Sequence, residues 1–415
     1  MEEFQNIFDE AKYKNHRVND SLKKKCIGVL GKLYSGINKI YKKVQKNFKD
    51  NGDIIKESVN NMDKDSKIMK EIKKKLAGED SFFDNRIKKH IIENVNYKLS
   101  CIYMLEKNKK IQISFYLMED MSNSKYDAFI NSIEKYFYIM ITWLIIGSLS
   151  SHKSCGSKNT MIVDIYLTPF DKYFPKNEVE EINPYNVNSG YTVRCGGTHG
   201  ITIFRKEEWF KVFLHETMHY FGFDTQLDNN NIKKQITDHF MLKDKVNQYE
   251  AYCEFWSRVM NSLFKSFMVI KDSEGTINDM IKMCIELLEY ERAFSSFQCY
   301  KFLNRCNINY DVEANADINN KLYRENTNSF AYYIITNILM DNWMKYINYC
   351  DTHNSDVLFY HTKNNNKFYE YIYNNYNNNT LLNNLTVSAD TLNKCNNNNI
   401  VGEYSTRMSI VDIEG

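Results

Sequence analysis

The sequence has few prolines and glycines, with 3 Pro and 15 Gly among its 415 residues. Collagen-like and mucin-like proteins are rich in these residues, so both classes are excluded. An excess of one charge is also lacking, because 54 Lys and Arg residues oppose 52 Asp and Glu residues. A net charge of +2 gives no overall attraction to nucleic acid, and we expect no nucleic-acid partner.

Long apolar runs are lacking as well. The apolar stretch from Tyr136 to Gly147 covers about a dozen residues, short of the roughly 20 that a membrane-spanning helix needs. We predict a buried core helix there and no transmembrane segment. The acidic N-terminus, Met1 to Phe4, lacks the apolar stretch of a secretory signal.

The ten cysteines include no C-x-x-C pair, so neither a zinc ribbon nor a thioredoxin-like redox site is predicted. Cys253 and Cys284 lie within predicted helices, where buried thiols behave as small apolar groups. We therefore expect no structural disulfide and an intracellular, reducing compartment.

The texture of the sequence changes along the chain and indicates four regions. Residues 1–95 are charged and favour helix, and residues 96–270 mix strand and helix patterns. Residues 271–363 are predicted to be helical, and residues 364–415 form an Asn-rich, partly loop-like tail. No pattern in the sequence predicts an oligomeric state.

The second of these regions begins with alternating apolar residues, which predict a β-hairpin. A helix, a β-branched strand, a proline-containing irregular segment and a short strand follow. The expected elements, in chain order, are strands at Tyr97–Met104 and Ile111–Met118, a helix at Lys125–Ser148, and strands at Met161–Leu167 and Ile201–Arg205.

Histidine is scarce, yet two of the nine residues stand four positions apart in the H-E-x-x-H motif of His215, Glu216 and His219. Side chains at i and i+4 share one face of a helix, so both imidazoles can bind one Zn²⁺. Glu216 lies beside His215, where its carboxylate can take a proton from a water on the metal. The motif therefore predicts a zinc site with Glu216 as the general base.

Gly222 follows three residues after His219 and offers a left-handed end to this helix. The alternative to a zinc site is a pair of core histidines in an all-helical scaffold, in which the motif is accidental. That alternative would bury an ionised Glu216 without a partner, which is energetically costly.

A zinc site needs a third protein ligand. In Tyr249–Trp256, Glu250 and Glu254 stand at i and i+4 among aromatic residues, so one carboxylate can bind the metal while the other orients a histidine. We prefer Glu250 as the ligand, and the exchanged roles stay open. Asp224 is a further candidate ligand, although a metzincin would have its third ligand one residue later, at Thr225.

The H-E-x-x-H motif, together with Glu250-x-x-x-Glu254 on a downstream helix, resembles the gluzincin branch of the zincin metallopeptidases. The resemblance covers roughly residues 96–270. It implies an α+β fold: a small mixed sheet with an edge strand at Ile201–Arg205, an active-site helix and a second, Glu-bearing helix. Helical N- and C-terminal additions would flank this zincin-like domain.

The resemblance also implies a function, which is hydrolysis of a peptide bond by a water that zinc activates. The ligands would be His215, His219 and Glu250, and the substrate a peptide or protein that pairs with the edge strand. No residue matches the family's transition-state His or Tyr. Tyr252, His239 and Tyr332 are the candidates for that role.

The stretch from Phe204 to Phe213 is also similar, in texture and composition, to uncharacterised metallopeptidase-like proteins of large DNA viruses. If the protein is viral, the host cytoplasm or the virion is its expected location. The alternative function is a zincin-derived metal-binding structural or binding protein, viral in origin, that has no turnover. An intact Glu216 argues against it, because a site without turnover does not need a base.

Overall fold

The computed structural model describes residues 8, 11–58, 67–77, 84–106, 109–118, 125–151, 155, 160–176, 180–196, 200–243, 246–308, 310, 323, 325–360, 366–394, 402 and 404–413. Within these ranges, no helix has both the length and the apolar character needed to cross a membrane.

The chain divides into two compact units, and each is discontinuous in sequence. We call one the sheet unit; it comprises Leu33–Asp171 and Asn188–Gly222. The other, the helical unit, comprises Met1–Lys32, Lys172–Val187 and Phe223–Gly415. The predicted zincin-like region, residues 96–270, is therefore shared between the two units.

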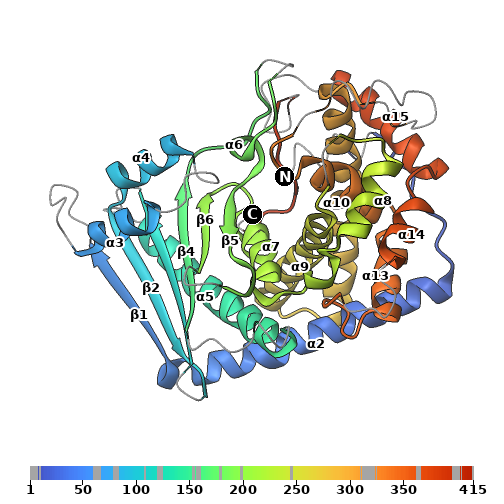
Figure 1. Ribbon diagram of the computed structural model, residues 1–415. Coiled ribbons are helices and arrows are strands. Elements are labelled where there is room, and N and C mark those ends of the chain that lie inside the picture. The colour runs from blue at the N-terminus through green and yellow to red at the C-terminus, as the bar shows by residue number, and fades with distance from the viewer. Residues whose placement is uncertain are drawn as a thin grey trace. The chain divides into compact units, whose positions relative to one another are not determined.

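The sheet unit holds a six-stranded mixed sheet in the order β1-β2-β3-β4-β6-β5 (Figure 1). Neighbouring strands are antiparallel except β3–β4 and β4–β6, which are parallel. The mixed sheet and the many helices confirm the predicted α+β class. The strands are β1 (Gly52–Ser58), β2 (Tyr97–Met104), β3 (Lys110–Leu117), β4 (Thr160–Thr168), β5 (Gly190–Thr192) and β6 (Ile201–Arg205).

Two predictions about this sheet are wrong. The strand Ile201–Arg205 is not an edge, because β4 pairs with one side of it and β5 with the other. The edge on this side of the sheet is β5. This strand has only three residues, which are too few to show an alternating pattern in the sequence. The N-terminal region was expected to be helical, but β1 at Gly52–Ser58 extends the sheet beyond β2.

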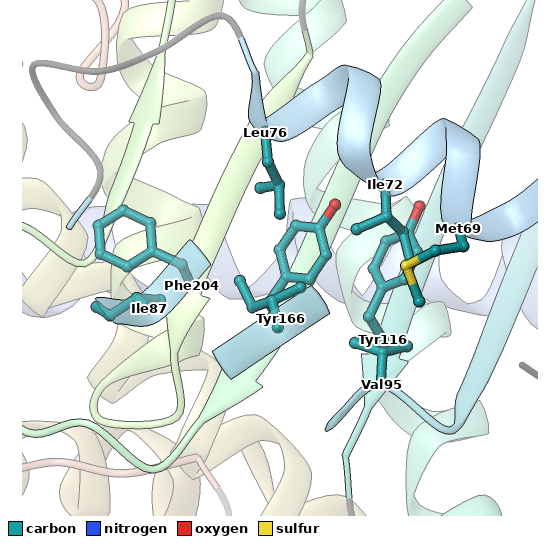
Figure 2. Close-up of a cluster of buried hydrophobic side chains, with 9 residues drawn as sticks. Met69, Ile72, Leu76, Ile87, Val95, Tyr116, Tyr166 and Phe204 are labelled. Atoms are coloured by element: carbon teal, nitrogen blue, oxygen red, sulfur yellow. The ribbon is translucent and has the colours of Figure 1, made fainter. Parts of the chain in front are cut away.

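One face of the sheet is covered by α3 (Lys67–Leu76) and α4 (Asn85–Asn94). Apolar residues recur on α3 every three to four positions, so Met69, Ile72 and Leu76 lie on one side and are buried against Tyr116 and Tyr166 (Figure 2). The two tyrosine rings stack, with centroids 4.4 Å apart. This cluster makes a core layer of the sheet unit.

The opposite face is covered by α5 (Lys125–Ser150) and α7 (Trp209–Phe221). Successive side chains of a strand alternate between faces, so Phe115 of β3 points away from Tyr116. Its ring packs against Phe137 of α5 and Trp209 of α7, with ring centroids 5.6 Å and 5.5 Å away. The apolar run within α5 is thus a buried core helix, as its length predicted.

A disulfide joins Cys155 and Cys195 in the sheet unit, so the expectation of no structural disulfide is wrong. Cys155 precedes β4 and Cys195 precedes β6, and these strands are parallel neighbours. The loops that lead into parallel neighbours lie at the same end of the sheet, which brings together cysteines 40 residues apart in sequence. Sequence spacing alone carries no sign of this pairing.

The helices that follow α7 along the chain belong to the helical unit. Its longest members are α9 and α10, and the Asn-rich region contributes two helices rather than loops alone. A π-helical segment, η4, precedes α12. The helices are α8 (Asn230–His239), α9 (Gln248–Asp272), α10 (Ile277–Arg305), η4 (Phe330–Ile335), α12 (Thr336–Asp341), α13 (Trp343–His353), α14 (Lys367–Tyr373) and α15 (Asn379–Lys394).

Three other helical elements complete the description. The helix α2 begins in the helical unit and ends in the sheet unit, and α6 forms one turn in the proline-containing segment. The elements are α2 (Asp20–Asn51), α6 (Pro184–Val187), and the 3₁₀ turns η2 (Arg194–Gly196) and η3 (Thr225–Leu227).

The C-terminal residues 404–413 are irregular in structure and mostly buried in the helical unit. Side chains of the long helices bind their backbone, as Asn261 does at the Val411 carbonyl (2.7 Å) and Lys301 at the Ser405 carbonyl (2.7 Å). Each buried carbonyl of an irregular segment needs such a donor. This segment is therefore part of the core.

Candidate metal centre

Helix α7 carries the H-E-x-x-H motif and directly follows β6. It is buried on nearly every side. Gly222 ends the helix in the left-handed conformation (φ 70°), and its N–H bonds to the His219 carbonyl at 3.0 Å. The predicted helix end is confirmed.

The imidazoles of His215 and His219 converge. Their Nε2 atoms lie 3.1 Å apart, and the ring centroids 4.9 Å apart. At this distance one ring donates its N–H and the other accepts. His215 is buried and His219 is half-buried.

This arrangement fits a tetrahedral metal ion. Two nitrogens that each bind zinc at about 2.0–2.1 Å lie about 3.3 Å apart across the ion. The observed 3.1 Å between the Nε2 atoms needs only a small opening to reach that separation. The metal would replace the proton that the two rings share.

The edge strand β5 passes close to Glu216. A Cβ atom placed on Gly190 would lie 3.2 Å from Cγ of Glu216 and 2.8 Å from Cγ1 of Val212. Such separations are shorter than ordinary contacts, so only glycine allows the β5 backbone this approach. The Glu216 side chain, which is buried, thus lies beside the outermost strand of the sheet.

Helix α7 is also tied to α5 through a residue inside the motif. The indole N–H of Trp143 donates to Oγ1 of Thr217 (2.5 Å), and that hydroxyl donates to the Leu214 carbonyl (2.7 Å). Both side chains are fully buried. The Trp143–Thr217 hydrogen bond therefore fixes which face of α7 lies against α5.

In the helical unit, Glu250 lies in the first turn of α9 and is buried. Tyr332 donates its hydroxyl to Oε2 of Glu250 (3.0 Å), and the Asn328 amide donates to Oε1 (3.2 Å). Asn328 in turn accepts from the Asn247 amide at 2.8 Å. Each carboxylate oxygen thus has a neutral donor.

Glu254, one turn later on α9, has a different setting. Its Oε1 accepts from Nε of Arg258 at 2.9 Å, and both side chains are almost completely buried. Arg258 also lies 4.0 Å from Glu291, which accepts backbone N–H groups of Ile410 and Val411 at 3.0 Å each. Glu254 therefore belongs to a charged network that reaches the C-terminal segment.

Asp224, the third carboxylate considered from the sequence, precedes the 3₁₀ turn η3 and is fully buried. The described residues include a candidate metal-binding group drawn from His, Glu, Asp and Cys side chains. Cys253 is a member that the sequence analysis treated as apolar. The available signal was its position three residues after Glu250, which puts both on one face of α9.

The three candidates for a transition-state residue differ in their surroundings. Tyr252 is fully buried, and its hydroxyl donates to the Leu358 carbonyl at 3.0 Å. The His239 ring packs among aromatic rings, with the Tyr376 centroid at 4.5 Å. Tyr332 alone among the three donates to a candidate metal ligand, Glu250.

No family model matches the sequence. A stretch of 123 residues is 32% identical to an uncharacterized protein of Acanthamoeba polyphaga mimivirus. The match covers 29% of this chain and 30% of that protein, so the chain spans about a third of the length of this relative. No solved structure matches the chain.

Proposed function

We propose that this protein is a zinc-dependent peptidase. The observation that carries the proposal is the convergence of the His215 and His219 Nε2 atoms at 3.1 Å on a buried helix, with Glu216 beside them. Two imidazoles and a carboxylate base form the protein part of a hydrolytic zinc site. The similarity to a mimivirus protein agrees with a viral origin. It does not indicate an activity, because that protein is uncharacterized.

Glu250 is the proposed third ligand. A carboxylate has about four lone-pair positions, and the hydrogen bonds from Tyr332 and Asn328 occupy one on each oxygen. Both of these donors are neutral, so neither cancels the negative charge of Glu250. The charge of Glu254 is already balanced by the Arg258 guanidinium, which makes Glu254 the poorer ligand.

When bound, zinc would lower the pKa of a coordinated water and polarise the scissile carbonyl. Glu216 would take the proton of the attacking water and then deliver it to the leaving amine. Its burial reduces its contact with bulk water, and the close backbone of Gly190 limits the movement of its side chain. Both effects favour a base that is oriented before the substrate arrives.

The proposed substrate is an extended peptide that pairs with β5. The sheet order ends at β5, and no other strand among the described residues pairs with its outer side. Free N–H and C=O groups of an edge strand can bind a peptide backbone. Because Gly190 of β5 approaches Glu216, a peptide on this edge would run past the base.

Metal analysis of the purified chain is the first test. We expect about one zinc per chain, retained in Glu216→Gln and lost in His219→Ala, because two imidazoles are needed for a stable site. The absence of zinc in the wild type would overturn the proposal.

Turnover is the second test, with zinc-loaded wild type and Glu216→Gln on a peptide library. The variant should cleave about 10²- to 10⁴-fold more slowly, which is the usual contribution of a general base. A variant as fast as the wild type would remove Glu216 from the mechanism. A wild type that binds zinc but cleaves no peptide would favour a metal-binding protein without turnover.

A further inference from the structure

Tyr332 and Asn328 stand four residues apart at the start of the π-helical segment η4 and reach the same carboxylate. The Tyr332 hydroxyl is 3.0 Å from Oε2 of Glu250, and the Asn328 amide is 3.2 Å from Oε1. Tyr332 and Glu250 are both buried, at 8% exposure each. Two donors at opposite oxygens fix both the position and the rotation of a carboxylate.

Two neighbouring tyrosines of the π-helical turn donate their hydroxyls to different acceptors. Tyr332 donates to Glu250, whereas Tyr333 donates to the Thr406 carbonyl at 2.6 Å. Both residues lie in η4, both are buried, and both hydroxyls have a partner. π-Helical turns are rare and occur often at functional sites, where they redirect side chains.

We propose that Tyr332 and Asn328 are positioning residues that hold the Glu250 carboxylate in the orientation in which it binds zinc. This inference rests on the proposed function, since it takes Glu250 as a ligand. The donors act through Glu250 and do not touch the substrate. Hydrogen bonds to a metal-ligating carboxylate typically strengthen metal binding 10- to 100-fold.

The reason is geometric. Without its two donors, the buried carboxylate would rotate toward other polar groups, and zinc binding would have to reverse that rotation. With them, the carboxylate is held in one orientation before zinc binds. Because both donors are uncharged, they orient Glu250 without neutralising it, which a lysine or arginine would do.

The test compares Tyr332→Phe with Tyr333→Phe in the full-length protein. Each variant removes one buried tyrosine hydroxyl from the same turn, but only the first removes a donor to Glu250. Zinc affinity is measured by competition with a fluorescent chelator. We expect about 10- to 100-fold weaker zinc binding for Tyr332→Phe and a change of less than about twofold for Tyr333→Phe.

Asn328→Ala supplies an independent measurement, because Asn328 is only half-buried and its replacement disturbs packing less. It should weaken zinc binding in the same direction, even if Tyr332→Phe fails to fold. Thermal unfolding of each metal-free variant reports whether the fold is kept. Equal zinc affinity in wild type, Tyr332→Phe and Asn328→Ala would overturn the inference and leave the proposed zinc site intact.

Three other outcomes are also decisive. Equal weakening by Tyr332→Phe and Tyr333→Phe would show a general packing effect and overturn the inference. Slower turnover of Tyr332→Phe with unchanged zinc affinity would place its hydroxyl on the substrate instead of on Glu250. A wild type without zinc would overturn the proposed function, and the inference with it.

Discussion

Helices α7 and α9 carry the residues proposed as metal ligands, and both are buried along most of their length, yet they are held in different ways. Helix α7 is positioned by contacts between its own side chains, by backbone geometry and by one uncharged hydrogen bond, from Trp143 of α5 to Thr217. Its motif side chains contact each other, Gly222 ends it, and Gly190 of β5 passes close against it.

Helix α9 is positioned by polar side chains from distant parts of the chain. Glu250 accepts hydrogen bonds from Asn328 and Tyr332, which lie 78 and 82 positions away in the sequence. Glu254 is linked through Arg258 and Glu291 to the C-terminal segment. The paired histidines of α7 therefore come from one short motif, whereas both carboxylates of α9 depend on partners from other parts of the helical unit.

The largest effect should come from breaking the charged network of α9. Arg258→Met would leave Glu254 buried without its guanidinium partner, because both side chains are only 1% exposed. We expect a loss of about 3–5 kcal/mol in the free energy of unfolding. Urea unfolding followed by tryptophan fluorescence measures it.

The matched control is the double variant Glu254→Gln/Arg258→Met, which removes both charges. It should be more stable than Arg258→Met, because Glu254 is then uncharged, while Glu291 loses Arg258 in both variants and keeps its hydrogen bonds from Ile410 and Val411. Equal stability of the single and double variants would show that Arg258 contributes by packing and not through its charge. In that case α9 would not differ from α7 in the way described above.

The next effect concerns α7 and its close contact with β5. In Gly190→Ala, the new Cβ would meet Val212 at 2.8 Å and Glu216 at 3.2 Å. We expect a loss of about 1–3 kcal/mol in stability. Turnover should also fall, with zinc content unchanged, because Glu216 is displaced while the histidines are not.

Adding Val212→Ala to Gly190→Ala should restore part of the stability, since it removes the nearest clash. The Glu216 contact remains in the double variant, so turnover should stay low. Wild-type stability and turnover in Gly190→Ala would mean that β5 does not constrain Glu216.

Much of the fold could be predicted from the sequence, because periodic patterns identify long elements. The hairpin strands and the buried helix α5 were expected from their apolar patterns, and the helix α7 from its H-E-x-x-H motif. The edge strand β5 was not, because three residues are too few to show alternation. The Cys155–Cys195 disulfide was missed because it depends on two strands being parallel neighbours.

The candidate site divides in the same way. His215, Glu216 and His219 form a local pattern whose chemistry can be read directly from the sequence. The choice between Glu250 and Glu254 could not be settled there, because their spacing is the same for either role. The choice depends on the hydrogen-bond donors of each carboxylate. Glu250 has the neutral donors Asn328 and Tyr332, whereas Glu254 has the charged donor Arg258.

A smaller effect tests the backbone geometry at the end of α7. Gly222 has φ 70°, a conformation that a side chain disfavours by about 1–2 kcal/mol. Gly222→Ala should be destabilised by about that amount, and Gly222→Asn by less, since Asn tolerates this region. The opposite sign is expected for Gly28→Ala in α2, where nothing lies within 4 Å of the new Cβ. Thermal melts of the three variants make the comparison.

The smallest expected effect is a pH dependence confined to the helical unit. Burial among the rings of Phe240, Tyr373 and Tyr376 lowers the pKa of His239 below its usual value of 6.5. Its Nε2 atom is buried and has no hydrogen-bond partner among the described residues. The folded protein therefore takes up this proton less readily than the unfolded chain.

The sign follows from proton linkage. The contribution of His239 is fully present above pH 6.5, and it is lost as the pH falls through 6.5 toward the lower pKa of the folded state. The sheet unit behaves differently at Asp84, where burial would raise the pKa but hydrogen bonds from Arg86 lower it below the usual value. The Asp84 contribution is lost only when the pH falls through about 4 and below.

His239→Phe should therefore melt like the wild type at pH 7.5, apart from a constant packing difference, and lose less stability than the wild type on transfer to pH 5.5. Asp84→Asn should show the same loss as the wild type over that interval, because Asp84 titrates at lower pH. If both variants lose stability in parallel with the wild type between pH 7.5 and 5.5, His239 is as exposed to solvent as an unfolded histidine. The aromatic packing around it would then contribute nothing to the acid sensitivity of the helical unit.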